Sequence, residues 1–322
     1  MSFAETFSRR RVFLMEGALG ERLKREHGLV YDRDVDMAGF VCRDGSRAAL
    51  ESLWREYLAI GEQYTLPMLV LTPTRRANRE RISRSAHTDG VIARNVDALR
   101  RVRDSSGAEA YLGGTMGCRG DAYTGSGALS ESAAERFHAW AAERFALAGA
   151  DFIYAALMPS APEAAGLARA CSGLGIPHIV SFMLRRDGTL PDGTFLHEAI
   201  RRIDESAERP PLCYMVNCVH PLIVADALSR DPNRTETVRD RLRGIQANAS
   251  PLAPGELEGS AALRGSDPDD LAENIMSLDR HIRLAVAGGG CGTDGRHIEA
   301  IARRLASRTA MEDGRTAREN TP

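Results

Sequence analysis

Lysine is almost absent from this chain of 322 residues, in which Lys24 is the only lysine and arginine supplies the other basic side chains. Schiff-base chemistry needs a lysine amine, so it has a single candidate here. Lys24 stands in the polar stretch GERLKREHG, which predicts a solvated surface position. The scarcity of lysine argues against lysine-dependent aldolases and pyridoxal enzymes.

Long apolar runs and an excess of charge are also missing. The amino terminus MSFAETFSRRRVFLMEGALG is too polar for a secretory signal, and the chain has no run of about 18 apolar residues. The formal net charge is -2, with acidic and basic residues mixed along the chain. We therefore expect a cytoplasmic protein without a nucleic-acid or membrane partner.

Cysteine is sparse, with six residues at irregular spacing. Such spacing does not predict a disulfide framework in a reducing compartment, so the thiols are available for chemistry.

Eight short apolar runs alternate with amphipathic stretches in which apolar residues recur every three or four positions. The runs are 12–20, 66–74, 110–117, 150–157, 176–184, 212–221, 244–250 and 284–293. This alternation predicts a single-domain α/β protein, a (β/α)8 TIM barrel over residues 1–311, followed by a polar flexible tail at 312–322. An open doubly wound sheet is disfavoured because MEGALGERL lacks the G-x-G-x-x-G spacing.

The chemistry of such barrels lies at the C-terminal ends of the strands. Side chains expected there are Glu16, Thr72, Thr74, Cys118, Ser181, Asn217, Cys218, Asn248 and Cys291. Cys213 lies five residues before Cys218, so the period of two places it on the opposite face, where packing is its expected role. Cys218 and Cys291 end the sixth and eighth strands, and two thiols facing each other there favour zinc. From spacing alone, two unconnected cysteines are an equally good interpretation.

At these residues the sequence resembles the homocysteine S-methyltransferase family. The likeness runs through MEGALGERL, LTPTRRAN, GGTMGCRGDAYTG, IVSFMLRRDGTLPDGT, MVNCVHP and GGGCGTDGRHI, the last two matching the family's N-C-x-x-P and G-G-C-C-G-T-x-x-x-H-I motifs. It implies transfer of a methyl group from a small-molecule donor to homocysteine or a related thiol, within methionine biosynthesis. It also implies one zinc ion bound by Cys218 and Cys291, which makes the acceptor thiol nucleophilic.

The resemblance further assigns substrate binding to Glu16, which replaces the family's Asp and would hold the acceptor's ammonium, and to Asn217 and Asn248 at the mouth. Two departures stand out: Gly290 replaces the second of the family's three zinc cysteines, and Ala156 replaces a Glu that binds the substrate's amino group.

The missing ligand leaves alternatives open. His220 and Cys118 are candidates for a third ligand, whereas His297 is expected to form hydrogen bonds and pack. The chain could be a working methyltransferase, or a catalytically impaired family member that binds or senses a thiol or amino-acid ligand. A third interpretation reads GGGCGT as a phosphate-binding turn. The methyl donor and the oligomeric state are not determined by the sequence.

Overall fold

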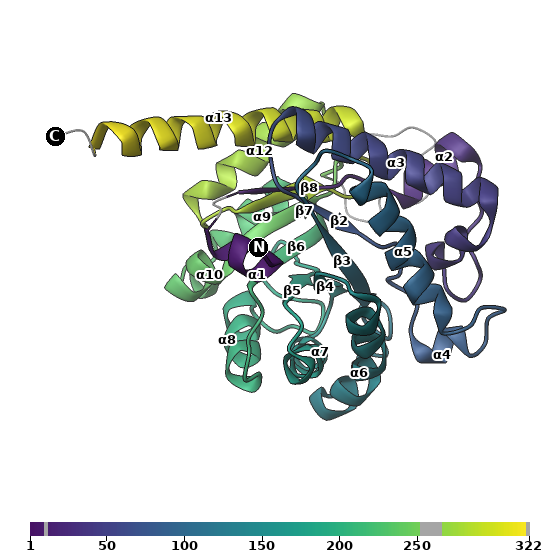
Figure 1. Cartoon of the computed structure of the whole chain (residues 1–322). Helices are drawn as coiled ribbons and strands as arrows, with labels where there is room; N and C mark the ends of the chain where they lie inside the picture. The colour runs from purple at the N-terminus through teal and green to yellow at the C-terminus, as the bar shows by residue number, and fades with distance from the viewer. Residues whose placement is uncertain (10–11, 252–265, 320–322) are drawn as a thin grey trace.

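A computed structural model describes residues 1–9, 12–251 and 266–319, with side chains described as far as Met311. Its eight strands form a closed barrel of parallel strands in sequence order (Figure 1). The strands are β1 (Phe13–Met15), β2 (Met68–Leu71), β3 (Ala110–Gly117), β4 (Phe152–Met158), β5 (His178–Phe182), β6 (Cys213–Val219), β7 (Leu242–Ala247) and β8 (Val286–Gly289). Each predicted run overlaps one of these strands, although β4 ends one residue after its run and β7 begins two residues before its run, and the TIM barrel is confirmed.

Helices cover the outside of the barrel (Figure 1). They are α1 (Phe3–Arg9), α2 (Gly20–His27), α3 (Asp44–Gln63), α4 (Arg79–Ile82), α5 (Gly90–Asp104), α6 (Glu131–Ala148), α7 (Ala161–Leu174), α8 (Leu196–Ser206), α9 (Pro221–Leu228), α10 (Glu236–Arg241), α12 (Pro268–Ser277) and α13 (Gly295–Glu319), with short 3-10 turns η1 (Met37–Cys42), η2 (Asp231–Asn233) and η3 (Leu278–Arg280). The strands are buried on both faces, because one face packs against these helices and the other fills the barrel interior.

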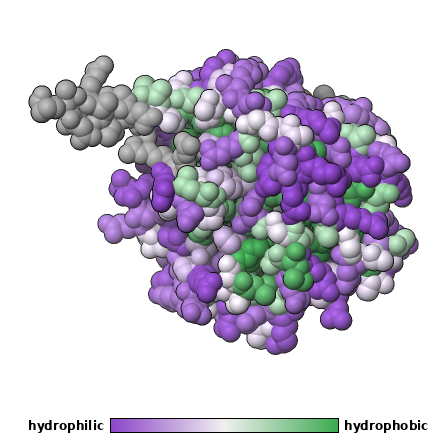
Figure 2. All heavy atoms as spheres, viewed as in Figure 1, coloured by the Kyte–Doolittle hydropathy of each residue, from purple (hydrophilic) through white to green (hydrophobic). Residues whose placement is uncertain are grey.

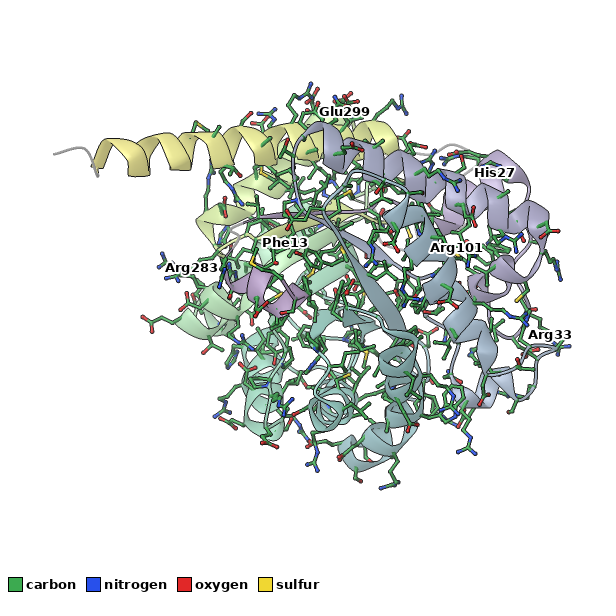
Figure 3. All side chains as sticks on the ribbon, viewed as in Figure 1. Phe13, His27, Arg33, Arg101, Arg283 and Glu299 are labelled. Atoms are coloured by element: carbon green, nitrogen blue, oxygen red, sulfur yellow. The ribbon has the colours of Figure 1, made fainter. Side chains whose placement is uncertain are left out.

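Helix α1 closes the N-terminal end of the barrel. Phe3 stacks on Phe152 with ring centroids 4.4 Å apart, and Phe7 stacks on Phe13 at 5.3 Å. Figure 3 shows the labelled Phe13 in the interior beside α1, whereas Arg33 and Glu299 lie at the periphery. These aromatic side chains fill the N-terminal end of the barrel interior, and the C-terminal end is the one at which such barrels carry their active sites.

The structure describes the backbone through most of the tail that is predicted at residues 312–322. Helix α13 continues to Glu319 and extends beyond the barrel (Figure 1). Helical hydrogen bonding therefore carries the backbone through residues 312–319, while 320–322 lie outside the described residues. The division into a barrel and a separate tail stays a prediction.

The surface is mainly polar. Figure 2 shows hydrophilic side chains over most of the visible face, with a smaller hydrophobic area in its lower centre. In the described part of the chain, no helix is long and apolar enough to cross a membrane.

Candidate active site

A cavity of about 230 Å³ opens at the C-terminal end of the barrel. Its walls come from the loops after β1, β2 and β3 and from the ends of β4, β6, β7 and β8. The side chains that give it chemical character are Glu16, Glu21, Tyr31, Asp36, Thr72, Arg75, Thr115, Tyr123, Tyr154, Asn217, Cys218, Gln246 and Cys291. The face expected from the fold therefore carries a cavity that contains both predicted thiols.

Cys218 and Cys291 are brought together as the sequence predicts. Their Sγ atoms lie 3.9 Å apart, both side chains are partly exposed, and neither forms a disulfide. A hydrogen bond from the Cys291 thiol to the Cys218 sulfur lowers the pKa of Cys218 and raises that of Cys291. Ionisation of Cys218 is thus favoured, and ionisation of Cys291 beside it is opposed.

A β-bulge directs Cys218 into the cavity. Asn217 pairs with Gln246 and Val219 with Ala247, so Cys218 is an extra residue in β6, and its φ is 55°. Strict alternation would instead turn Cys218 outward, because Cys213 faces the barrel interior. Our reason for separating the two cysteines by face is therefore wrong, whereas the packing role of Cys213, which is fully buried, is confirmed.

Cys291 sits in a turn whose amide groups are already engaged. The N–H of Gly290 donates to the carbonyl of Ala247 at 2.7 Å, that of Thr293 to Gly290 at 3.1 Å, and that of Gly292 to the carboxylate of Glu21. An acidic side chain at this turn opposes an anion, so the geometry disfavours the phosphate-binding interpretation.

Gly290 leaves room where the family has a cysteine. A Cβ atom built on Gly290 would lie 3.3 Å from the carbonyl oxygen of Gln246 and 3.4 Å from that of Ala247, and no closer to any other atom. These contacts need only a small shift of the neighbouring strand β7.

Glu16 is only 2% exposed at the base of the cavity. Its Oε2 accepts a hydrogen bond from the N–H of Leu71 at 3.1 Å, and in the described residues no cation forms an ion pair with it. Burial raises the pKa of Glu16 well above its usual 4.5, although the Leu71 hydrogen bond partly opposes this. A cationic ligand group beside Glu16 would restore its charged form.

Of the two asparagines predicted to bind substrate, only Asn217 lines the cavity. Asn217 lines the cavity, and its Oδ1 accepts hydrogen bonds from Ser181 Oγ at 2.7 Å and from the N–H of Leu157 at 3.0 Å. It therefore ties the ends of β4, β5 and β6 together. Asn248 is not among the lining residues, and its Oδ1 accepts from the N–H of Ser250 at 3.1 Å.

Neither candidate for a third metal ligand joins the thiol pair. His220 caps α9 by accepting from the N–H of Leu222, and its Nε2 lies 3.1 Å from Ser266 Oγ. Cys118 donates to the carbonyl of Gly120, and burial raises its pKa to about 11. His297 bonds Asp294, as the sequence predicts for a structural histidine. Among the residues that the structure describes, no group of three or more His, Cys, Asp or Glu side chains could hold a metal ion.

Sequence reasoning missed several lining residues because they lie within loops rather than at strand ends. Arg75 follows β2, Tyr123 follows β3, and Glu21 and Tyr31 follow β1. The exposed Lys24, expected at the surface, places its Nζ 3.9 Å from the centre of the Tyr31 ring. A search extended a few residues into each loop at this end of the barrel would have found them.

Comparison with known proteins gives one family and one group of solved structures. The sequence model of the homocysteine S-methyltransferase family matches residues 13–305. The metallated form of the homocysteine methyltransferase MmuM from Escherichia coli has a TM-score of 0.72 at 18% identity, over 93% of this chain and 98% of that one. Its oxidized form has a TM-score of 0.71 at 18% identity, over 92% and 97%. No curated protein sequence matches this chain significantly. At this identity the structural likeness establishes a shared fold.

Proposed function

Because the chain belongs to the homocysteine S-methyltransferase family, we propose that it transfers a methyl group from a small-molecule donor to the thiol of homocysteine or a related acceptor. The observation that carries the proposal is the Cys218–Cys291 pair, with sulfurs 3.9 Å apart in the cavity at the C-terminal end of the barrel. We keep the cytoplasmic location and the place in methionine biosynthesis as predictions.

The spacing of the thiols fits two ligands of one zinc ion. Two Zn–S bonds of about 2.3 Å at a tetrahedral angle hold their sulfurs about 3.8 Å apart, close to the 3.9 Å between Cys218 and Cys291. We infer that these two residues hold zinc and that position 290, a glycine here, leaves the site open on that side. When bound, zinc would supply deprotonation of the acceptor thiol, which alone is only a few per cent thiolate at neutral pH.

The residues of the chain then position the acceptor and exclude water. Glu16 would hold the acceptor's ammonium at the base of the cavity, since its buried carboxylate gains a charge partner there. Asn217, fixed by Ser181 and Leu157, shapes the wall next to Cys218. Asn248, which does not line the cavity, would act only through the loop after β7, where it accepts from the N–H of Ser250.

The reaction is a direct displacement. The acceptor sulfur forms a bond to the methyl carbon while the bond from that carbon to the cationic donor atom breaks, and its electron pair stays with the donor. Once the thiol has lost its proton to solvent, no general base is needed, and alignment of the reactants supplies most of the remaining acceleration.

A turnover assay tests the proposal. Purified chain is supplied with zinc, homocysteine and, in turn, S-methylmethionine, S-adenosylmethionine and betaine, and methionine is quantified. We expect turnover with at least one donor, and its loss in Cys218→Ser and Cys291→Ser. Cys171→Ser is the matched control, because Cys171 is fully buried in α7, outside the cavity. Methylation by metal-free protein at the full rate would contradict the zinc mechanism.

Gly290 gives one specific reason to consider a second function. A member of the family with a weakened metal site could bind or sense a thiol or amino-acid ligand without turnover. Homocysteine binding in calorimetry, combined with no methylation from any donor and no bound zinc, would favour this alternative.

A further inference from the structure

Arg75 is the one cationic side chain among the described residues that line the cavity, where Glu16, Glu21 and Asp36 are acidic. It follows β2 and is about one quarter exposed. The rest of the lining consists of thiols, hydroxyls, amides, aromatic rings and aliphatic side chains. A guanidinium at such a place can recognise an anionic group of a ligand.

Hydrogen bonds fix the loop that carries Arg75. Thr72 Oγ1 and Thr74 Oγ1 are 2.7 Å apart, Thr74 Oγ1 donates to the carbonyl of Thr115 at 2.9 Å, and the N–H of Thr115 donates to Thr72 Oγ1 at 3.1 Å. Gly117 makes room for the Arg75 stem, because a Cβ there would lie 2.6 Å from Arg75 Cγ and 2.9 Å from its carbonyl oxygen. The loop is thus fixed to β3 directly before the arginine.

Close carboxylates do not neutralise this guanidinium. In the described part of the chain its ion pair is with Asp36, at a long Nη2–Oδ2 distance of 3.8 Å. The other acids of the cavity have different partners: Glu21 accepts from the N–H of Gly292, and Glu16 from that of Leu71. The fork of Arg75 therefore keeps donors for a bidentate contact with an added carboxylate.

Arg75 and Glu16 lie on the same side of the cavity. Glu16 ends β1 and bonds Leu71 at the end of β2, four residues before Arg75. In a closed barrel of eight strands, β2 is opposite β6, which carries Cys218, whereas Cys291 follows β8, the neighbour of β1. A compound with its thiol at the cysteines would extend its other end toward Glu16 and Arg75.

Resting on the proposed function, we propose that Arg75 binds the carboxylate of the thiol acceptor and makes the site selective for acceptors that carry both a carboxylate and an ammonium group. The ammonium occupies Glu16 and the carboxylate the Arg75 fork. Arg75 is then a determinant of specificity for the acceptor, besides the effect of its positive charge on the two thiols.

The test compares homocysteine with 3-aminopropane-1-thiol, which is homocysteine without its carboxylate. Dissociation constants of both compounds are measured by calorimetry, with KM and kcat where turnover occurs, for wild type, Arg75→Gln and Arg75→Lys. We expect wild type to bind homocysteine roughly ten- to hundredfold more tightly than the amine thiol, the range of a charged hydrogen bond. Arg75→Gln should lose this preference while its affinity for the amine thiol stays the same, and Arg75→Lys should recover part of it.

Arg79→Gln is the matched control, since Arg79 is an exposed residue of α4 in the same segment, and thermal unfolding verifies that each variant folds. Equal weakening of both compounds in Arg75→Gln, an unchanged preference, or no binding of homocysteine to wild type would each overturn the proposal. Selective binding that depends on Arg75, without methyl transfer from any donor, would support it while removing the proposed function.

Discussion

At the scale of single residues, Glu16 combines deep burial with the absence of a paired cation in the described structure. Burial favours its protonated form in the folded chain, whereas an ammonium ligand would favour its ionised form. The ligand and the proton therefore compete for the same carboxylate. This competition makes both stability and acceptor binding depend on pH.

Glu16→Gln tests this behaviour. The folded-state pKa lies above the ordinary 4.5 of the unfolded chain, so wild type loses free energy of unfolding as pH rises from 4.5 through the folded pKa. The variant should lack this contribution, so urea titrations at a series of pH values should show that it loses less stability than wild type as the pH rises above 4.5. Glu143→Gln, on an exposed side chain, should follow wild type; a Glu16→Gln profile identical to wild type would exclude a raised pKa.

The same variant should weaken homocysteine binding by roughly ten- to hundredfold, because it removes a charged hydrogen bond. Wild-type binding should also release protons, which calorimetry detects in buffers of different ionisation enthalpy. Binding that releases no proton and tolerates Glu16→Gln would show that the ammonium lies elsewhere.

The sequence predicted Glu16, Cys218 and Cys291 because each ends a strand and matches a motif. The sequence could not predict that the Cys218 side chain points into the cavity, because this direction depends on the β-bulge, which is set by the register between β6 and β7. Arg75 and Tyr123 were missed because a loop of any conformation could carry them away from the cavity. Asn248, although it follows β7, turns to its own loop.

At the scale of elements, the loop of residues 118–130 between β3 and α6 is held by Glu163 of α7. The Glu163 carboxylate is fully buried and accepts from the N–H of Arg119 at 2.7 Å, from that of Leu129 at 3.1 Å, and contacts His138 Nε2 at 3.2 Å. It thus fixes both ends of the loop that brings Tyr123 to the cavity.

Glu163→Gln should loosen this loop. Both carboxylate oxygens accept hydrogen bonds, so the NH2 group of glutamine must face a donor, which costs about 1–3 kcal/mol of stability. We expect a lower free energy of unfolding and faster hydrogen exchange at the amides of 119–129, with smaller changes in other loops. An unchanged exchange rate at Arg119 and Leu129 would show that Glu163 does not hold the loop; Glu143→Gln again serves as the control.

At the scale of the whole molecule, eight apolar runs were enough to predict the barrel, because a parallel sheet covered on both faces needs such runs in alternation with helices. The length of α13 was not predictable, since its last residues are polar and their composition favours no packed face. The barrel also separates its two ends: α1 and its phenylalanines stabilise one, and the cavity occupies the other.

Phe3→Ala tests this separation. Phe3 is 2% exposed, and removal of a buried phenylalanine ring lowers the free energy of unfolding by about 3–5 kcal/mol. Methyl transfer measured well below the unfolding temperature should keep its kcat/KM, because the cavity lies at the other end. Leu147→Ala, on a residue that is 80% exposed, should change stability little. A loss of kcat/KM in folded Phe3→Ala would show that the two ends are coupled.

The central claim is that Cys218 and Cys291 form a zinc site whose open position is residue 290. Zinc content after purification in limited metal, measured together with homocysteine methylation for wild type, Gly290→Cys and the sterically matched Gly290→Ala, tests it most directly. We predict that Gly290→Cys retains more zinc than wild type, toward one ion per chain, while Gly290→Ala does not. Equal zinc in Gly290→Cys and Gly290→Ala, or wild-type methylation that persists without metal, would contradict the account.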